Sequence, residues 1–301
     1  MHEKYVPLSY CWGPATHTYR LNHQTIKDML GGIDESRLAV AHRDTLALAQ
    51  ALGVRLVWID ALCIIQGDSQ DWEHESKLMA SVYGNTTLTA VVGRTGDSRN
   101  HCLINDYKQL APCCEMLLQN PSIGRVLVGL KRSPDYGVAE TRGWCLQERR
   151  LSRRIVVFGK EQLFFSCRKE DYSEDRYYDQ NDSSHHTGLI TANADLSSAR
   201  DQLLQQWNTV LIDFSKKREL SNTHDIFAAI VSIATLISKA IGCRHLADLW
   251  ECDIVICNVS YFGPATRPLS TRLAAAPILR APSWSWAAIQ GGVNLTTRRS
   301  F

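Results

Sequence analysis

The sequence predicts an α/β fold in which a largely parallel sheet is flanked by helices, followed by a mainly helical C-terminal region. Up to Gly159, short apolar segments of strand length alternate with segments that have the period of a helix. Beyond residue 200, helical periods dominate. The order strand, helix, strand, helix, strand is typical of a parallel sheet with helical crossovers.

The first predicted strand is the apolar run YVPLS at residues 5–9, which ends in the turn YCWG. It is either a strand that leads into a functional loop or an edge strand followed by an ordinary turn. Residues 34–53 predict a helix, with Gly53 at the position just past its end. One face of this helix carries Leu38, Ala41, Thr45, Leu48 and Leu52. Residues 54–65, VRLVWIDALCII, are almost continuously apolar, which predicts a strand buried on both faces.

Residues 71–83 predict a second helix with Asp71 as its N-cap. Its core side carries Trp72, Met79 and Tyr83. The β-branched run TTLTAVVG at residues 86–93 predicts a further strand. The next predicted elements are a strand at 124–131, a short helix at 142–152, and two strands at 154–159 and 161–167 that a Gly-Lys turn separates.

Residues 168–200 are mostly polar and include the run RKEDYSEDRYYDQNDSSHH, which predicts a boundary. We therefore divide the chain into an α/β domain at 1–168, a polar linker or loop at 169–200, and a helical region with late strands at 201–301. In that last region we expect helices at 201–220 and 224–242 and a strand at RAPSWSWAAI, residues 280–289.

Composition is that of an ordinary globular protein, with 301 residues, 45% of them hydrophobic and 21% charged. The net charge of +2 gives no overall basic field, so we expect no nucleic-acid partner. The longest apolar run, Ile226 to Ile237, is shorter than the roughly 20 residues of a membrane-spanning helix. No secretory signal opens the chain. We expect a cytoplasmic protein without a membrane span.

The ten cysteines follow no C-x-x-C zinc pattern and fit a reducing compartment. His101, Cys102, Cys113 and Cys114 could be drawn together around a metal, but their spacing matches no common zinc template, so no metal is expected. Cys63 could be a nucleophile with His74 as its base. A buried, inert Cys63 is the favoured interpretation, because nothing near it in sequence would lower its pKa.

The common nucleotide-binding and hydrolase motifs are absent: the chain has no GxGxxG after a strand, no GxxxxGK[ST], no GxSxG and no HExxH. A candidate site is therefore positional, at the carboxyl ends of the parallel strands, where open α/β sheets bind ligands. Three segments qualify: the loop after the first strand, residues 60–66, and the helix at 142–152. The ligand-binding candidates are Ser9, Tyr10, Trp12, Gly13, Cys63, Gln66, Arg142 and Trp144.

Three carboxylates are the catalytic candidates. Asp60 ends the run RLVWID, where it either caps the following turn or presents its carboxylate at the binding edge. Glu75 falls on or near the apolar face of its helix, where a carboxylate needs a partner. The simpler interpretation is a salt bridge with an arginine of a neighbouring helix. Glu148 lies four residues after Trp144, and nearby arginines leave an Arg-paired surface glutamate as its alternative.

The blocks YVPLSYCWG, LVWIDALCIIQGDSQDWEHESKLMASVYGNTTLTAVVG and TRGWCLQERRLSRRIVVFG together resemble the heterokaryon incompatibility (HET) domain of filamentous fungi. They occur in the family's order between residues 5 and 160. Where the family usually has an acidic pair after the Ile-Gln of the second block, this chain has Gly67–Asp68. The resemblance implies a role in non-self recognition and in the cell death that follows fusion of incompatible strains.

A more distant resemblance is to Toll/interleukin-1 receptor (TIR) domains, since LSY, WID and WCLQE occur here in the order of similar TIR segments. It implies a TIR- or flavodoxin-like sheet. In catalytic TIR domains the glutamate of the last segment serves NAD cleavage, and this role maps onto Glu148. A much longer segment separates TAVVG from RGWCLQE here than in TIR domains.

The two resemblances together imply a death-effector domain that cleaves NAD as a substrate and needs no firmly bound cofactor. Trp12 or Trp144 could stack on a nucleotide ring, and the backbone at Gly13 could approach a phosphate, with core packing as the alternative for both tryptophans. Two other functions stay open. One is a non-catalytic module that self-associates or binds another incompatibility protein, and the other is an enzyme of fungal secondary metabolism that uses the same pocket.

Overall fold

The structure is a computed structural model, and its described residues form two compact units. The first unit comprises Met1–Trp72, Asn85–Ala139 and Ser152–Thr187, and the second comprises Glu73–Gly84, Glu140–Leu151 and Gly188–Phe301. Each unit is described by itself below. The described residues are 3–13, 19–103, 114–117, 125–128, 137–167, 169–174, 196–220, 222–246, 249–254, 263–264, 281–282, 285–288 and 293–294.

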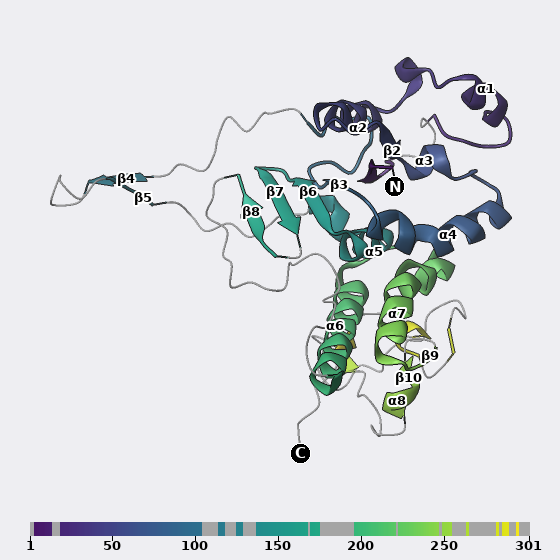
Figure 1. The fold of residues 1–301 in the computed structure, drawn as a ribbon, viewed down its shortest axis with the longest axis vertical. Coiled ribbons are helices and arrows are strands. Elements are labelled where there is room, and N and C mark those ends of the chain that lie inside the picture. The colour runs from purple at the N-terminus through teal and green to yellow at the C-terminus, as the bar shows by residue number, and fades with distance from the viewer. Residues whose placement is uncertain are drawn as a thin grey trace. The chain divides into compact units, whose positions relative to one another are not determined.

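The first unit is built on a six-stranded sheet with the order β2-β1-β3-β6-β7-β8, which confirms the predicted α/β class (Figure 1). Strands β2, β1, β3 and β6 are parallel, and β7 and β8 extend the sheet in antiparallel fashion. The strands are β1 (Tyr5–Ser9), β2 (Leu56–Trp58), β3 (Thr89–Val92), β6 (Arg154–Phe158), β7 (Leu163–Cys167) and β8 (Asp171–Ser173).

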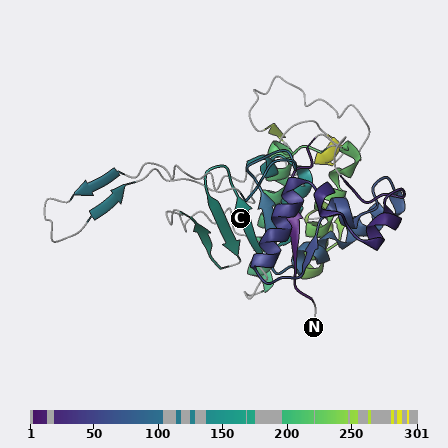
Figure 2. The ribbon, with the colours of Figure 1, turned by 90° about the horizontal axis from the view of Figure 1, so that it is seen from above.

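Strand β1 lies inside the sheet, because it pairs with β2 on one side and with β3 on the other. The edge-strand alternative for residues 5–9 is therefore wrong. Alternate residues Val6, Leu8 and Tyr10 enter the main apolar core, which also includes Ala49 of helix α2 (Val40–Ala51). Helix α2 packs against β1 and β2 and covers that face of the sheet (Figure 2).

Strand β2 is shorter and more exposed than the sequence predicts. It has three residues, lies at the sheet's edge, and leaves Leu56 43% exposed. The apolar run at 54–65 therefore does not form one strand buried on both faces. It divides instead into β2 and the short helix α3 (Asp60–Cys63), and its apolar side chains Val54, Ile59 and Ile64 are buried.

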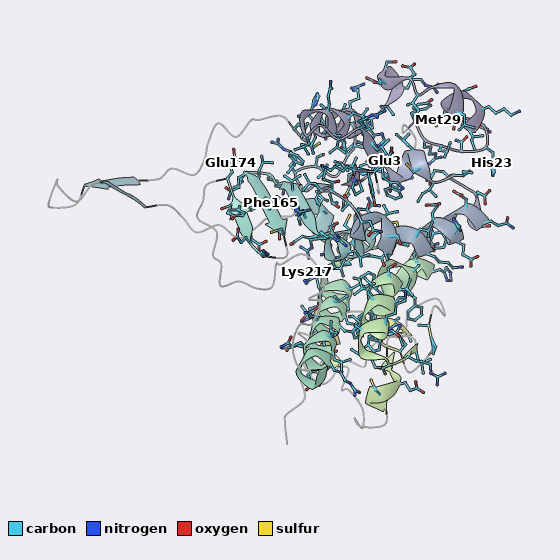
Figure 3. The ribbon with its side chains drawn as sticks, in the orientation of Figure 1. Glu3, His23, Met29, Phe165, Glu174 and Lys217 are labelled. Atoms are coloured by element: carbon cyan, nitrogen blue, oxygen red, sulfur yellow. The ribbon has the colours of Figure 1, made fainter. Side chains whose placement is uncertain are left out.

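The first unit has further short elements outside this sheet. They are α1 (Ile26–Gly31), the 3-10 helices η2 (Glu35–Arg37) and η4 (Gly137–Glu140), and the antiparallel strands β4 (Cys114–Leu117) and β5 (Arg125–Val128). The predicted strand at 124–131 corresponds to β5. Figure 3 labels Phe165 in β7 and Glu174 just after β8, and the Glu174 carboxylate accepts the N–H of Leu163 at 3.1 Å.

The helix α4 (Ser69–Gly84) begins two residues earlier than the sequence predicts. Asp68, not Asp71, caps it, because the Asp68 carboxylate accepts the N–H groups of Gln70 and Asp71. Asp71 accepts the N–H of Ile65 instead, at 2.7 Å. Met79 and Tyr83 are buried as expected. Trp72 is 38% exposed, so its predicted place on the core side is wrong.

The second unit is mainly helical, as the sequence predicts for the C-terminal region. Helix α7 packs against α5 and α6. The strand expected at 280–289 is wrong for residues Trp286–Ala288. These residues form the 3-10 helix η7, in which Trp286 is buried against Phe214. The elements are α5 (Gly143–Leu151), α6 (Leu196–Lys217), η6 (Thr223–Ile226), α7 (Ala228–Ile241), α8 (Glu251–Ile254), β9 (His245–Leu246), β10 (Leu249–Trp250), β11 (Gly263–Pro264) and β12 (Val293–Asn294).

The helical stretch Thr223–Ile241 is longer than the apolar run that the sequence alone delimits. Its 19 residues have a mean hydropathy of 1.5, so length and composition alone would let it cross a membrane. Helix α7, which forms most of it, buries one face completely against its neighbours in the second unit. That face carries Ala229, Ile230, Ile233, Ala234 and Ile237. Burial of this kind is typical of a core helix.

Candidate functional site

The carboxyl ends of β1, β2 and β3 meet at one edge of the sheet, because the three strands are parallel neighbours. Strand β1 leads into Tyr10–Gly13, β2 leads into Asp60, and β3 leads into residues 93–98. The chain moves to one side of β1 to form β2 and to the other side to form β3. Strand order thus reverses at β1, and ligands of open α/β sheets bind at such a switch point.

Trp12 and Asp60, both predicted site residues, are joined at this edge. The indole Nε1–H of Trp12 donates to Oδ2 of Asp60 at 2.9 Å. The other carboxylate oxygen, Oδ1, accepts the N–H of Ala61 at 2.7 Å. Asp60 therefore does cap the following turn, as one interpretation held, and it also fixes the orientation of the half-buried Trp12 ring.

Two residues that the sequence analysis missed complete this edge. Asp97 lies so close to Gly13 that a Cβ on Gly13 would be 2.8 Å from the Asp97 Cγ, and Ser98 Oγ donates to the Trp12 carbonyl at 2.8 Å. The neighbouring Arg99 guanidinium, through its hydrogen bonds, lowers the pKa of Asp97 to about 2, so this carboxylate is charged at neutral pH. Their position just after β3 was the signal that could have identified them.

Gly13 has a φ of +81°, a backbone conformation that favours glycine. We expect Gly13→Ala to destabilise the protein by about 1–2 kcal/mol from backbone strain, with a further cost from the contact with Asp97. Gly53→Ala is the matched control, because Gly53 has a φ of +66° and open space around its Cβ position. Urea unfolding of both variants measures the difference. Equal losses in the two would show that the close approach to Asp97 has no energetic consequence.

Tyr10 and His42 form a buried polar pair beneath this edge. The Tyr10 hydroxyl lies 2.9 Å from Nε2 of His42, and the two rings meet edge to face. Burial lowers the pKa of His42 to about 4, so the imidazole is neutral at neutral pH. His42 was not among the residues predicted for the buried face of the helix at 34–53, although its side chain is fully buried. Tyr10 thus has its hydroxyl engaged within the protein.

Asp44 holds His101 and Cys102 in place through hydrogen bonds. Its carboxylate accepts the N–H groups of Cys102 at 2.7 Å and Leu103 at 3.2 Å, and it contacts His101 Nδ1 at 3.1 Å. Burial opposes ionisation of Asp44, but these donors outweigh it and hold its pKa below the usual value. Burial also raises the pKa of the Cys102 thiol. These contacts fasten a loop.

The described residues contain no group of three or more His, Cys, Asp or Glu side chains that could hold a metal ion. Of the four residues considered from the sequence, Cys113 lies outside the described residues, and only the backbone of Cys114 is described. His101 and Cys102 are accounted for by Asp44.

Three candidate site residues of the first unit remain. One of them holds a loop, one is exposed, and one is buried. The Gln66 amide Nε2 donates to the carbonyls of Ile64 at 2.9 Å and Asp60 at 3.3 Å, which holds the loop that carries Asp60. Cys63 is exposed, so the favoured interpretation of a buried thiol is wrong, because its short helix turns it away from the core. Ser9 is buried, and its Oγ has no hydrogen-bond partner among the described residues.

Glu148, Arg142 and Trp144 belong to the second unit, as does Glu75, which is half-buried in α4. Most residues of helix α5 are buried, and Glu148 is only 7% exposed, so a surface glutamate is excluded. Gly143 allows the close packing at the helix start, since a Cβ there would lie 2.4 Å from a methyl carbon of Leu220.

Polar contacts fix the axis and rotation of α5. Gln147 Oε1 accepts the N–H of Ser232 on α7 at 3.2 Å. Arg149 lies 3.7 Å from the Asp213 carboxylate of α6, and Arg218 binds the same carboxylate at 2.9 Å. Although burial alone would raise the pKa of Asp213, the two guanidinium groups lower it below its usual value. The Trp144 side chain is hydrogen-bonded to Asp225.

Comparison with protein families finds a match over slightly less than half of the chain. Residues 5–148 match the family described as heterokaryon incompatibility protein (HET), a match that begins at β1 and ends at Glu148 of α5. Comparisons with curated proteins and with solved structures found no match. The chain therefore carries a heterokaryon incompatibility (HET) domain over residues 5–148.

Proposed function

We propose that this protein acts in heterokaryon incompatibility, the role that its HET domain implies, by cleaving the nicotinamide–ribose bond of NAD in the cytoplasm. The observation that carries the proposal is the Trp12–Asp60 pair at the carboxyl edge of a parallel sheet, at the point where strand order reverses. Doubly wound sheets bind nucleotides at this position.

The described contacts make Trp12 suitable as a stacking surface for a nucleotide ring. Its indole is half-buried, its nitrogen is held by Asp60, and its carbonyl is held by Ser98. A residue whose ring nitrogen and backbone carbonyl are both hydrogen-bonded loses little further conformational freedom when a ligand stacks on its ring. The tight turn at Gly13 lets the backbone beside this ring approach a phosphate closely.

The reaction requires a group that stabilises positive charge on the ribose. Departure of nicotinamide gives the sugar oxocarbenium character, and a nearby carboxylate stabilises that charge more strongly where water is excluded. We assign this role to Glu148, on the basis of the resemblance to catalytic TIR domains. Its burial within α5 and the several contacts that fix that helix suit a positioned carboxylate. Water supplies the oxygen that replaces nicotinamide on the sugar.

The experiment is to incubate the purified protein with NAD and to follow nicotinamide release by chromatography. We expect the wild-type protein to turn over NAD. For Trp12→Ala we expect a KM about tenfold higher, which corresponds to about 1.4 kcal/mol and falls within the roughly 1–3 kcal/mol of base–aromatic stacking. Trp12→Phe keeps an aromatic face and should recover part of this loss. Exposed Trp72→Ala is the matched control and should leave KM unchanged.

Absence of nicotinamide release from the wild-type protein, with NAD-binding also absent, would reject the proposal. It would favour a module that self-associates or binds another incompatibility protein, which analytical ultracentrifugation of the same sample would detect. An equal KM in Trp12→Ala and wild type would remove Trp12 from the binding site.

A further inference from the structure

Cys243 and Cys252 lie beside each other in the second unit, one on each side of the β9–β10 hairpin, whose strands are labelled in Figure 1. The hairpin pairs Leu246 with Leu249 and His245 with Trp250. Beyond the hairpin, Glu251, the first residue of α8, donates its N–H to the Arg244 carbonyl at 3.0 Å. Cys243 comes directly before Arg244, and Cys252 comes directly after Glu251, so the two cysteines flank this hydrogen bond.

A direct contact joins the two cysteines. The N–H of Cys252, in the first turn of α8, donates to Sγ of Cys243 at 3.0 Å, which brings the Cys243 sulfur next to the Cys252 backbone. The pKa of Cys243 is raised, first by burial and then by the adjacent Cys252 thiol. Both thiols are reduced and partly exposed, so a small oxidant can reach them.

The hairpin is held in this register by its neighbours. Arg244 and Glu251 form a two-point ion pair, with distances of 2.8 and 2.6 Å. On the next pair, His245 and Trp250 pack against each other and against Trp207 of α6. These contacts exist while the cysteines are reduced, so closing a disulfide requires little rearrangement of the backbone.

We propose that Cys243 and Cys252 form a reversible disulfide, and that this pair makes the second unit responsive to the thiol redox state. The oxidant is a low-molecular-weight disulfide such as glutathione disulfide. One cysteine thiolate attacks it, which releases one glutathione and leaves a mixed disulfide. The second thiolate attacks the protein sulfur of that mixed disulfide and releases the other glutathione. Two protein thiols are oxidised, and one disulfide is reduced to two thiols.

The test is to equilibrate the full chain in buffers of defined glutathione and glutathione disulfide ratio, and then to trap free thiols with an alkylating reagent. Peptide mass spectrometry should find Cys243 linked to Cys252, with two protein thiols lost and both regained in dithiothreitol. Because Cys257 shares a tryptic peptide with Cys252, the measurement is repeated in Cys257→Ser. The oxidised form should unfold about 5 °C higher, because a short loop is closed.

Cys243→Ser and Cys252→Ser separate this proposal from general thiol reactivity. Each single variant should stop at one mixed disulfide with glutathione on the remaining cysteine, and exposed Cys63→Ser should still form the linked pair. Independent glutathione adducts on Cys243 and Cys252 in the wild-type protein, without a link between them, would overturn the proposal. NAD turnover plays no part in this measurement, so its result is separate from that of the proposed function.

Discussion

Glu148→Gln is expected to lower the rate of nicotinamide release from NAD by about 10²-fold or more, the range associated with loss of a positioned charged group. Glutamine has nearly the same volume as glutamate and can stay buried in α5, but it carries no charge to stabilise the oxocarbenium-like ribose. The loss should appear in kcat, because charge develops on the sugar only as the bond breaks. Glu148→Ala should lose at least as much.

The matched control is Glu73→Gln, because the Glu73 side chain is 66% exposed and pairs with the exposed Lys77, 2.7 Å away. It should turn over like the wild-type protein. Circular dichroism and thermal unfolding of Glu148→Gln distinguish lost chemistry from lost folding, since α5 is a core helix of the second unit. A folded Glu148→Gln protein with unchanged kcat would exclude the assigned role.

Acidification from pH 7 to pH 4 is expected to destabilise the first unit by about 3 kcal/mol through His42 alone. Burial lowers the pKa of His42 from 6.5 in the unfolded chain to about 4 in the folded protein. The unfolded chain therefore binds this proton first. The contribution of His42 to stability is complete above pH 6.5 and is lost as the pH falls toward 4, with about 2 kcal/mol gone by pH 5.

The measurement is the free energy of unfolding in urea at a series of pH values, for wild type and for His42→Gln. Glutamine cannot titrate in this range, and its amide can still bond the Tyr10 hydroxyl, so the two curves should converge as the pH falls. His23→Gln is the control, because His23 is exposed and contacts only the partly exposed Asp68, at 3.2 Å, among the described salt bridges (Figure 3). Parallel curves for wild type and His42→Gln would contradict the prediction.

Elements with a clear local pattern were predicted well. The helix at 142–152 and the strands at 154–159 and 161–167 correspond to α5, β6 and β7. The turn between the two strands follows from Gly159 and Lys160, and the glycine after α2 has the expected positive φ. In each case the hydrophobic period, the strand length and the turn residues all indicate the same structure. The local sequence therefore agrees with the tertiary contacts.

Strand β2 shows where the pattern was insufficient. The apolar run at 54–65 was equally compatible with one central strand and with a short edge strand followed by a helical turn, because a continuous apolar run has no period that distinguishes them. Trp72 was misplaced for a related reason. A residue near the start of a helix can satisfy the helical period and still lie beyond the surface that the helix buries.

By itself, the sequence determined the α/β class, the HET domain and the strand-end position of Trp12 and Asp60, because each depends on short segments read in order. Only the tertiary structure decided that β1 is central, that His42 is buried against Tyr10, and that Asp97 meets Gly13. The two residues of each contact, and the strands that pair with β1, are far apart in the chain. Sheet order and register decide which of these distant segments come into contact, and the packing of the whole unit sets both.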